Sequence, residues 1–132
     1  MYTITRYHDI SCGHRVVGHE SKCRHLHGHN YRIHFTCSTK ELDSIGRVID
    51  FSVVKHLLCY WIETNWDHKL LLWDTDPVGI SLLEIDNLDI FQSIVRIPFN
   101  PTAENIAYYL VNVVGPEVFA HENVKLISCS VS

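Results

Sequence analysis

Apolar and polar residues alternate along two long segments in the first third of the chain. Between Tyr2 and Cys12 the even-numbered positions form one face and the odd-numbered positions the other, which predicts a strand that ends at Gly13. The same period of two predicts a second strand over His27–Cys37, and the polar segment before it, which contains Gly18, predicts a long loop. We therefore expect an antiparallel pair of strands. One face of the second strand carries His27, His29, Tyr31, Ile33, Phe35 and Cys37.

Two later segments repeat their apolar residues with the period of a helix. The first helix is predicted over Asp50–Asn65, with Asp50 or Ser52 as its N-cap. The second is predicted over Thr102–Val114 with Thr102 as its N-cap, and the Gly115-Pro116 pair is expected to end it. The predicted apolar faces consist of Phe51, Val54, Leu58, Trp61 and Ile62 in the first helix, and of Ala103, Ile106, Ala107, Leu110 and Val114 in the second.

Two shorter segments complete the predicted fold. Ile94–Phe99 predicts a short strand, which Pro98 places at a sheet edge or ends, and Asn123–Val131 predicts the last strand. The order strand, strand, helix, short strand, helix, strand indicates the α+β class. We expect a single domain over residues 1–132, with both helices packed on one face of an antiparallel sheet.

The composition narrows the range of functions. The chain has 132 residues, a formal net charge of −4 and no long basic run, which argues against a nucleic-acid partner. No apolar stretch is long enough to span a bilayer, and Met1 is followed by an alternating segment rather than an apolar signal sequence, so we expect a cytoplasmic protein with no membrane partner. Five widely spaced cysteines with no C-x-x-C pair argue against a disulfide framework.

The residues between His14 and His29 are rich in histidine, a pattern that indicates either a metal site or only an exposed polar patch. His27 and His29 share one face of the second predicted strand, so both imidazoles can reach one ion. His14 follows the first strand, beside the start of the second, and is the natural third ligand. Three imidazoles with one open position are typical of catalytic zinc, and other divalent ions are compatible with the same donors. His34 faces the opposite way, and His25 lies in the loop.

Three further residues are candidates for proton transfer. Cys23 lies in the loop between Lys22 and Arg24, whose positive charges favour the thiolate, but an inert loop cysteine has the same pattern. Asp67 and His68 follow the first helix. A carboxylate beside an imidazole can form a proton relay, or the pair can be an ordinary helix end with a solvated aspartate. The residues alone leave both alternatives open.

Together these motifs resemble a known family. The segments ISCGHR, KCRHLHGHNY, GRVIDFSVVK, WDHKLL and NPTAENIAYYL resemble, in order and approximate spacing, the 6-pyruvoyl-tetrahydropterin synthase superfamily. The spacing between Cys23 and His27 resembles its 6-carboxy-tetrahydropterin synthase branch, the queuosine-pathway enzyme. The resemblance implies a tunnelling fold (T-fold), in which small antiparallel sheets with paired helices assemble across subunits into a barrel, here as a tetramer or hexamer.

The resemblance also implies an activity and the residues that perform it. The family reaction converts 7,8-dihydroneopterin triphosphate to 6-carboxy-5,6,7,8-tetrahydropterin, acetaldehyde and triphosphate. By resemblance Cys23, Asp67 and His68 form the catalytic relay, often across a subunit interface. Thr102 and Glu104 in the NPTAEN segment are the expected substrate-binding residues. The implied zinc ligands are His14, His27 and His29.

The last predicted strand departs from the family pattern. The family carries a glutamate and a threonine there, and the glutamate pairs with the pterin, whereas NVKLISCSVS places Ser128 and Cys129 at these positions. A serine cannot make the bidentate, charge-assisted contact of a carboxylate. Three interpretations therefore stay open: the carboxy-tetrahydropterin synthase, a pyruvoyl-type or related pterin side-chain lyase, and a non-catalytic T-fold protein that binds a metal or a purine-like ligand. Trp66 and Leu72 also differ from the family's residues, and we interpret both as packing positions.

Overall fold

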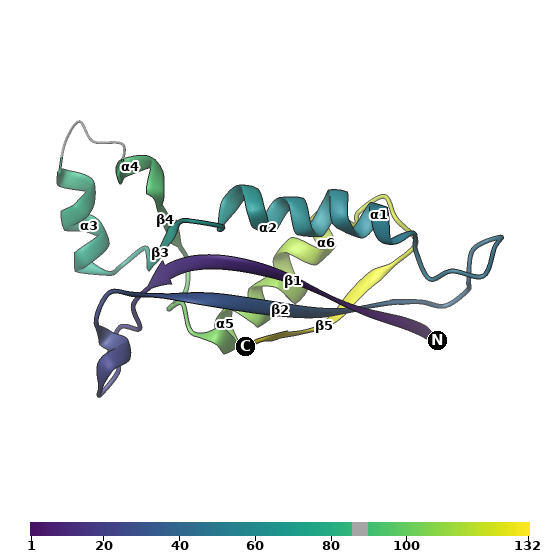
Figure 1. The fold of residues 1–132 in the computed structure, drawn as a ribbon, viewed down its shortest axis with the longest axis horizontal. Helices are drawn as coiled ribbons and strands as arrows, with labels where there is room; N and C mark the ends of the chain where they lie inside the picture. Colours follow the sequence, from purple (N-terminus) through teal and green to yellow (C-terminus); the bar gives the residue numbers. More distant parts are fainter. Residues whose placement is uncertain (86–89) are drawn as a thin grey trace.

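The computed structural model describes residues 1–85 and 90–132, which form a five-stranded sheet with two long helices packed against it (Figure 1). The strands lie in the order β4-β3-β1-β2-β5. β2 is antiparallel to β1 and β5, whereas β3 is parallel to both β1 and β4, so the sheet is mixed rather than fully antiparallel as the sequence predicted. The strand bounds are β1 Tyr2–His14, β2 His27–Thr39, β3 Leu70–Trp73, β4 Ile94–Ile97 and β5 Lys125–Val131.

The long ribbon of β1 and β2 confirms the predicted antiparallel pair. Its register joins Tyr2 to Thr39 at one end and His14 to His27 at the other. The predicted division of residues between faces is also confirmed, because the apolar residues of one face are buried and the residues of the other are largely exposed. The buried residues of that face are Ile10, Cys12, Tyr31, Ile33, Phe35 and Cys37.

Gly13 continues β1 instead of ending it, which corrects the prediction. It pairs with Gly28 of β2 on one side and with Leu70 of β3 on the other. A Cβ atom at Gly13 would lie 3.1 Å from Leu70 Cδ1 and 3.4 Å from the carbonyl oxygen of His27. The glycine is therefore needed for the close approach of β3, and β1 extends two residues further to His14.

The two long helices lie largely where the periodicity placed them. The first comprises α1 (Phe51–Val54), a π-helical turn (Lys55–Cys59) and α2 (Tyr60–Asn65). The second comprises α5 (Ala103–Tyr109), a π-helical turn (Leu110–Val114) and α6 (Gly115–Val118). Both predicted N-caps are confirmed: Asp50 accepts a hydrogen bond from the Ser52 N–H, and Thr102 accepts one from the Asn105 N–H.

The Gly115-Pro116 pair does not end the second helix, contrary to the prediction. The helix continues to Val118, and Pro116 sits in the first turn of α6, where a missing backbone N–H is tolerated. A Cβ atom at Gly115 would lie 2.9 Å from Leu126 Cβ. This glycine serves the close contact between helix and β5 rather than a helix stop.

Three elements between the long helices were not predicted. β3 was missed because its residues, LLLW, form a short apolar run without alternation. The helix α3 (Pro77–Glu84) begins with a cap by Asp76, which accepts a hydrogen bond from the Val78 N–H. The short helix α4 (Ile90–Ser93) precedes β4, which lies at the sheet edge as predicted. None of the helices in the described ranges has the length and hydropathy needed to cross a membrane.

One hydrophobic core lies between the sheet and the two long helices. It joins the buried face of β1 and β2 to the apolar stripe of each helix and to Leu126 of β5. Packing against this core fixes the end of β1, the start of β2 and the start of α5 relative to one another. Its helix residues include Val54, Leu58, Cys59, Ile62, Ile106, Leu110 and Val114.

Candidate active site

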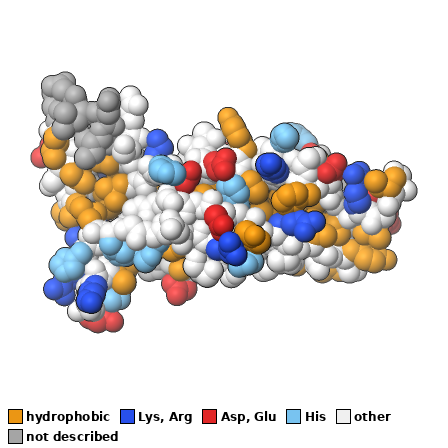
Figure 2. All heavy atoms as spheres, viewed as in Figure 1, with side chains coloured by type: hydrophobic (Ala, Val, Ile, Leu, Met, Phe, Trp, Pro, Cys, Tyr) orange, Lys and Arg blue, Asp and Glu red, His pale blue; other side chains and the backbone are white. Residues whose placement is uncertain are grey.

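Three histidines meet at the end of the β1–β2 ribbon, where Figure 2 shows histidine side chains gathered next to lysines and arginines at the left of the view. His14 ends β1 and pairs across the ribbon with His27, and His29 lies two residues further along β2 on the same face. The Nε2 atoms of His14 and His27 are 3.1 Å apart. One ligand nitrogen from each of the three residues lies within 4.8 Å of the others. The structure thus brings the three predicted metal ligands together.

Two backbone carbonyls decide which imidazole nitrogen faces the centre of the cluster. His14 Nδ1 lies 2.6 Å from the carbonyl oxygen of Pro101, and His27 Nδ1 lies 2.7 Å from that of His25. A carbonyl oxygen only accepts, so each Nδ1 carries the proton and each neutral Nε2 keeps its lone pair. Two lone pairs that face each other repel unless a cation lies between them, so these donors fit a divalent metal ion.

Burial favours the neutral form of His14 and His29. Burial lowers the pKa of His14; its hydrogen bond to Pro101 opposes this shift, and the neighbouring His27 and His29 lower the pKa further. Burial and the proximity of His27 also lower the pKa of His29. A neutral imidazole is the form that binds a metal ion. The environment therefore prepares two of the three residues to act as ligands.

Tyr31 forms the base of the cluster, and sequence reasoning did not identify it. Its ring stacks on His29 with centroids 5.0 Å apart and meets His14 edge-on at 5.7 Å. Its hydroxyl lies 3.1 Å from His14 Nε2. Burial raises the pKa of Tyr31, so the hydroxyl stays protonated and can donate. Its position on the same strand face as His27 and His29 was the available signal.

Cys23 lies in the loop that leads from β1 to β2. It is half-buried in a short 3₁₀ turn (Lys22–Arg24), and its carbonyl oxygen accepts a hydrogen bond of 2.7 Å from the Val16 N–H. Val16 lies two residues after His14, so this bond holds the turn that contains Cys23 close to the end of β1. The loop therefore carries Cys23 to the vicinity of the histidine cluster.

Asp67 and His68 form an ordered pair attached to the edge of β1. Asp67 Oδ1 accepts a hydrogen bond of 2.9 Å from the Ser11 N–H, and Oδ2 lies 2.9 Å from His68 Nδ1. The His68 N–H in turn donates to the Ser11 carbonyl oxygen at 2.6 Å. His68 has a left-handed backbone conformation with a φ of 59°, which is uncommon for a residue other than glycine. Asp67 and His68 are therefore held by specific hydrogen bonds, unlike the solvated aspartate at an ordinary helix end that the sequence left open.

The hydrogen bonds to Asp67 favour its ionised form. Burial acts to raise the pKa of Asp67, but the Ser11 N–H and the His68 side chain outweigh it, so the pKa is lowered. An ionised carboxylate accepts the Nδ1 proton of His68 and leaves Nε2 of that imidazole free. The His68 side chain is 80% exposed. Asp67 can therefore fix the tautomer of an imidazole that points into solvent.

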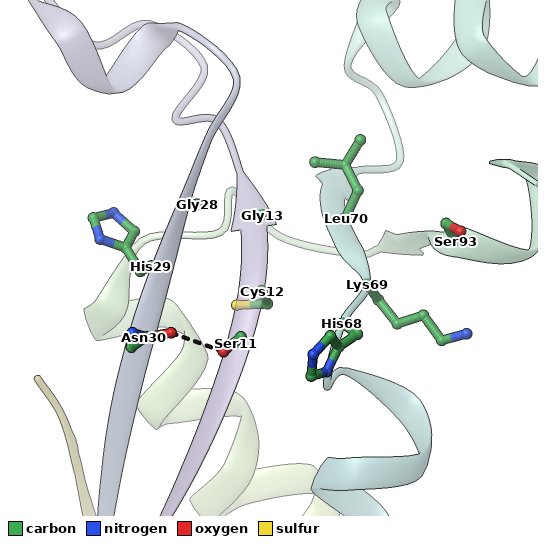
Figure 3. Close-up of a pocket in the computed structure, with 10 residues that line it drawn as sticks. All are labelled: Ser11, Cys12, Gly13, Gly28, His29, Asn30, His68, Lys69, Leu70 and Ser93. Carbon is green, nitrogen blue, oxygen red and sulfur yellow. Dashed lines mark hydrogen bonds between the residues drawn. The ribbon is translucent and has the colours of Figure 1, made fainter.

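A cleft of about 530 Å³ connects this pair to the ribbon. Figure 3 shows its lining, with His29 beyond β2 on one side and His68 beyond β1 on the other. In this view the two residues lie on either side of β1 and β2, and both line the same cleft. Cys12 also lines the cleft, but burial and the charge of Asp67 raise its pKa to about 12, so it stays a protonated thiol. Of the three clustered histidines, His29 is the one that shares this cleft with His68.

The expected substrate-binding residues lie at the start of α5. The Thr102 hydroxyl oxygen caps the helix by accepting a hydrogen bond of 3.1 Å from the Asn105 N–H. Glu104 lies in the first turn of the helix and is exposed. On β5, Ser128 is exposed opposite Thr36. Cys129 is half-buried, and burial raises its pKa to about 12, so it offers no negative charge in place of a carboxylate.

Other residues missed by sequence reasoning act mainly through their backbone. Pro101 and His25 orient metal-site imidazoles through their carbonyl oxygens, and Ser11 holds Asp67 and His68 through its N–H and C=O groups. Asn100 makes two side-chain hydrogen bonds to Val17 in the loop. Any residue type can make a backbone contact, so the sequence gives no sign of the roles of Pro101, His25 and Ser11. Asn100 acts through its side chain, so its residue type was the one available signal.

Comparisons with known proteins agree with this geometry. The model of the family described as 6-pyruvoyl tetrahydropterin synthase matches residues 3–132. A relative from Rickettsia typhi, named 6-carboxy-5,6,7,8-tetrahydropterin synthase, is 41% identical over 124 residues, which cover 93% of this chain and 87% of that protein. An uncharacterized protein from Wolinella succinogenes has a solved structure that matches with a TM-score of 0.83 at 25% identity, covering 99% of this chain and 92% of that one. The 6-pyruvoyl tetrahydropterin synthase of Plasmodium falciparum matches with a TM-score of 0.73 at 20% identity, covering 99% and 90%. The T-fold expected from the sequence is confirmed.

Proposed function

Because this chain belongs to the 6-pyruvoyl tetrahydropterin synthase family, we propose that it acts as a 6-carboxy-5,6,7,8-tetrahydropterin synthase. The reaction converts 7,8-dihydroneopterin triphosphate and water to 6-carboxy-5,6,7,8-tetrahydropterin, acetaldehyde and triphosphate, as a step towards queuosine. The observation that carries the proposal is the cluster of His14, His27 and His29, whose nitrogens converge within 4.8 Å. Relatives named for this reaction at 37–41% identity over most of the chain support the same activity.

The first element of the proposal is a divalent metal ion, with zinc as the preferred ion. His14, His27 and His29 would hold it, because two of them have their Nδ1 protons committed to carbonyl oxygens and a neutral Nε2 left to bind. When bound, the ion would act as a Lewis acid on the oxygen atoms of the substrate side chain. Tyr31 packs against two of the rings and keeps them in this orientation.

The second element is proton transfer by this chain's own side chains. Asp67 holds the Nδ1 proton of His68, so His68 Nε2 is the atom that accepts a proton from substrate and returns it. Cys23, in the turn Lys22–Arg24, would remove a second proton as the carbon–carbon bond of the side chain breaks. The two groups would thus act on two different protons of the same substrate.

The third element is an active site shared between subunits. In Figure 3 His29 and His68 lie on either side of β1 and β2, so we propose that a second subunit completes the site around the substrate. We place the relay of one subunit against the histidine cluster of the next, in a cytoplasmic tetramer or hexamer. The solvent-exposed His68 side chain, 80% accessible in the single chain, supports this arrangement.

Substrate recognition is the part of the proposal in which this chain differs from the family pattern. Ser128 stands where the family has a pterin-binding glutamate, and it is exposed on β5. Glu104 lies in the first turn of α5, three residues after Pro101, whose carbonyl oxygen contacts His14, so we assign it the contact with the amino-pyrimidine edge, with Thr102 beside it. A carboxylate accepts two hydrogen bonds from such an edge, which a serine cannot do.

A product assay tests the function directly. Purified protein loaded with zinc is incubated with 7,8-dihydroneopterin triphosphate, and the pterins and acetaldehyde are quantified against a Cys23→Ala control. We expect 6-carboxytetrahydropterin and acetaldehyde in equal amounts from the native chain and a loss of both in the control. A 6-pyruvoyl product without acetaldehyde would instead identify the pyruvoyl-type lyase. No product above the control, with metal and pterin still bound, would identify a binding protein.

A further inference from the structure

We propose that Asn100 is a positioning residue that holds the loop of Cys23 in place beside the histidine cluster. The proposal rests on the proposed function only in giving Cys23 a role in catalysis. Asn100 lies just before Pro101 and Thr102, far from the loop in sequence. Its side chain is the link between the two segments.

The contact of Asn100 with the loop is reciprocal. Its Oδ1 accepts a hydrogen bond of 2.9 Å from the Val17 N–H, and its Nδ2 donates one of 2.9 Å to the Val17 carbonyl oxygen. Both bonds are partly buried. The amide thus pairs with a backbone residue as a neighbouring strand would. Aspartate lacks the donor, and glutamine is one methylene longer, so asparagine is the side chain that fits.

The contact is transmitted to Cys23 through one further hydrogen bond. The Val16 N–H donates to the carbonyl oxygen of Cys23 at 2.7 Å. Val16 and Val17 are adjacent, so the short segment they form is bonded to Asn100 at one residue and to Cys23 at the other. Between Val17 and Cys23 the chain turns at Gly18, which has a φ of 82°. At the start of the loop Arg15 forms an ion pair of 2.8 Å with Asp76, and Asn100 holds the segment that follows.

Asn100 is itself fixed by bonds that do not involve its side chain. Its carbonyl oxygen accepts from the Thr102 N–H at 2.7 Å and from Asn105 Nδ2 at 3.0 Å. The next carbonyl, that of Pro101, orients His14. A substitution of the Asn100 side chain leaves these backbone acceptors in place. It should therefore release the Cys23 loop while the metal ligands keep their orientation.

Three variants separate this role from a general effect on folding. Asn100→Ala removes both bonds to Val17, and Asn100→Asp keeps the acceptor but removes the donor. Asn112→Ala is the matched control, because Asn112 also bonds a backbone carbonyl through Nδ2, to Tyr108 at 2.9 Å, but on the exposed surface of the second helix. Each protein is measured for zinc content, for the rate of iodoacetamide alkylation at Cys23 relative to buried Cys37, and for kcat and KM.

For Asn100→Ala we expect unchanged zinc content, alkylation of Cys23 at least about threefold faster, and kcat lower by roughly tenfold, since small displacements of a reacting group cost rates of this order. Asn100→Asp should fall between this variant and the native chain, and it supplies the comparison if the alanine variant does not fold. Asn112→Ala should match the native chain in every measurement.

Two results would overturn the proposal. One is native alkylation and native kcat in both Asn100 variants. The other is a loss of zinc in proportion to activity, which would mean that Asn100 acts through Pro101 and His14. If the native chain turns over no pterin, the proposed function fails, but the alkylation and zinc measurements still decide the role of Asn100.

Discussion

Replacing Asp67 with asparagine should reverse the tautomer of His68. Asp67 Oδ1 accepts the Ser11 N–H, and this bond requires an oxygen, so the amide oxygen of the asparagine takes the same place. The amide NH₂ then points at His68 Nδ1, where the carboxylate oxygen Oδ2 lay at 2.9 Å. An NH₂ group donates, so Nδ1 must become the acceptor and the proton moves to Nε2. The Nε2 atom then no longer accepts a proton.

The expected fall in kcat follows from the loss of a proton acceptor at His68 Nε2, and the small expected change in stability follows from the Ser11 hydrogen bond, which is kept. General acid–base catalysis by a positioned imidazole contributes about 10²- to 10⁴-fold in rate, so we expect kcat to fall by that factor, or by about 3–5 kcal/mol in activation free energy. The Ser11 hydrogen bond remains, so the free energy of unfolding should change by no more than about 1 kcal/mol. The Asp67 side chain bonds Ser11 and His68 rather than the histidine cluster, so zinc content should not change.

The assay is the steady-state rate of acetaldehyde release, measured beside zinc content and thermal unfolding. Asp43→Asn is the matched control, because Asp43 also accepts backbone N–H groups, from Ile45 and Arg47, but in an exposed loop far from the ribbon end. It should retain native activity. A kcat for Asp67→Asn within about threefold of native, well short of the loss expected for a positioned base, would refute the assigned relay.

Two further predictions concern the histidine cluster. His27→Ala should weaken zinc binding at least about 100-fold, since loss of a residue that only supports a metal ligand already weakens binding about 10–100-fold. His34→Ala, on the opposite strand face, should leave zinc binding unchanged. Equal losses of zinc from the two variants by elemental analysis would contradict the assigned strand face. Chelator-treated protein should lose stability as the pH falls below about 6.5, because burial lowers the folded-state pKa of His14 and His29 and the unfolded chain then binds more protons. Thermal melts across this range should show a falling melting temperature, and a flat profile would contradict the buried neutral imidazoles.

Much of the fold was predictable because period-two and period-3.6 patterns record which side chains are buried. The face that carries His27 and His29 followed from strand alternation alone, and so did the exclusion of His34. The long helices followed from their apolar stripes and from the caps Asp50 and Thr102. These features depend on side chains that the sequence displays directly.

The sequence-based prediction of the fold was wrong where backbone contacts rather than side-chain patterns determine the structure. Gly13 and Gly115 suggested breaks, but both permit close contact with a neighbouring strand, with Leu70 and Leu126 respectively. A glycine required for approach and a glycine required for a turn look the same in a sequence. β3 was missed for a related reason: it is buried from both sides, so it has no polar face to reveal its period.

One strand, β1, fixes both halves of the proposed site, and this limits how each half can change. His14 at its end supplies a side chain to the cluster, while the backbone of Ser11 holds Asp67 and His68 at its edge. The two half-sites are only three residues apart along a rigid, fully paired strand, so neither can move without the other. His29 and His68 lie on either side of β1 and β2 in Figure 3, so in the proposed assembly a neighbouring subunit would complete each half. The rigidity of β1 would then transmit subunit packing directly to the geometry of both active sites.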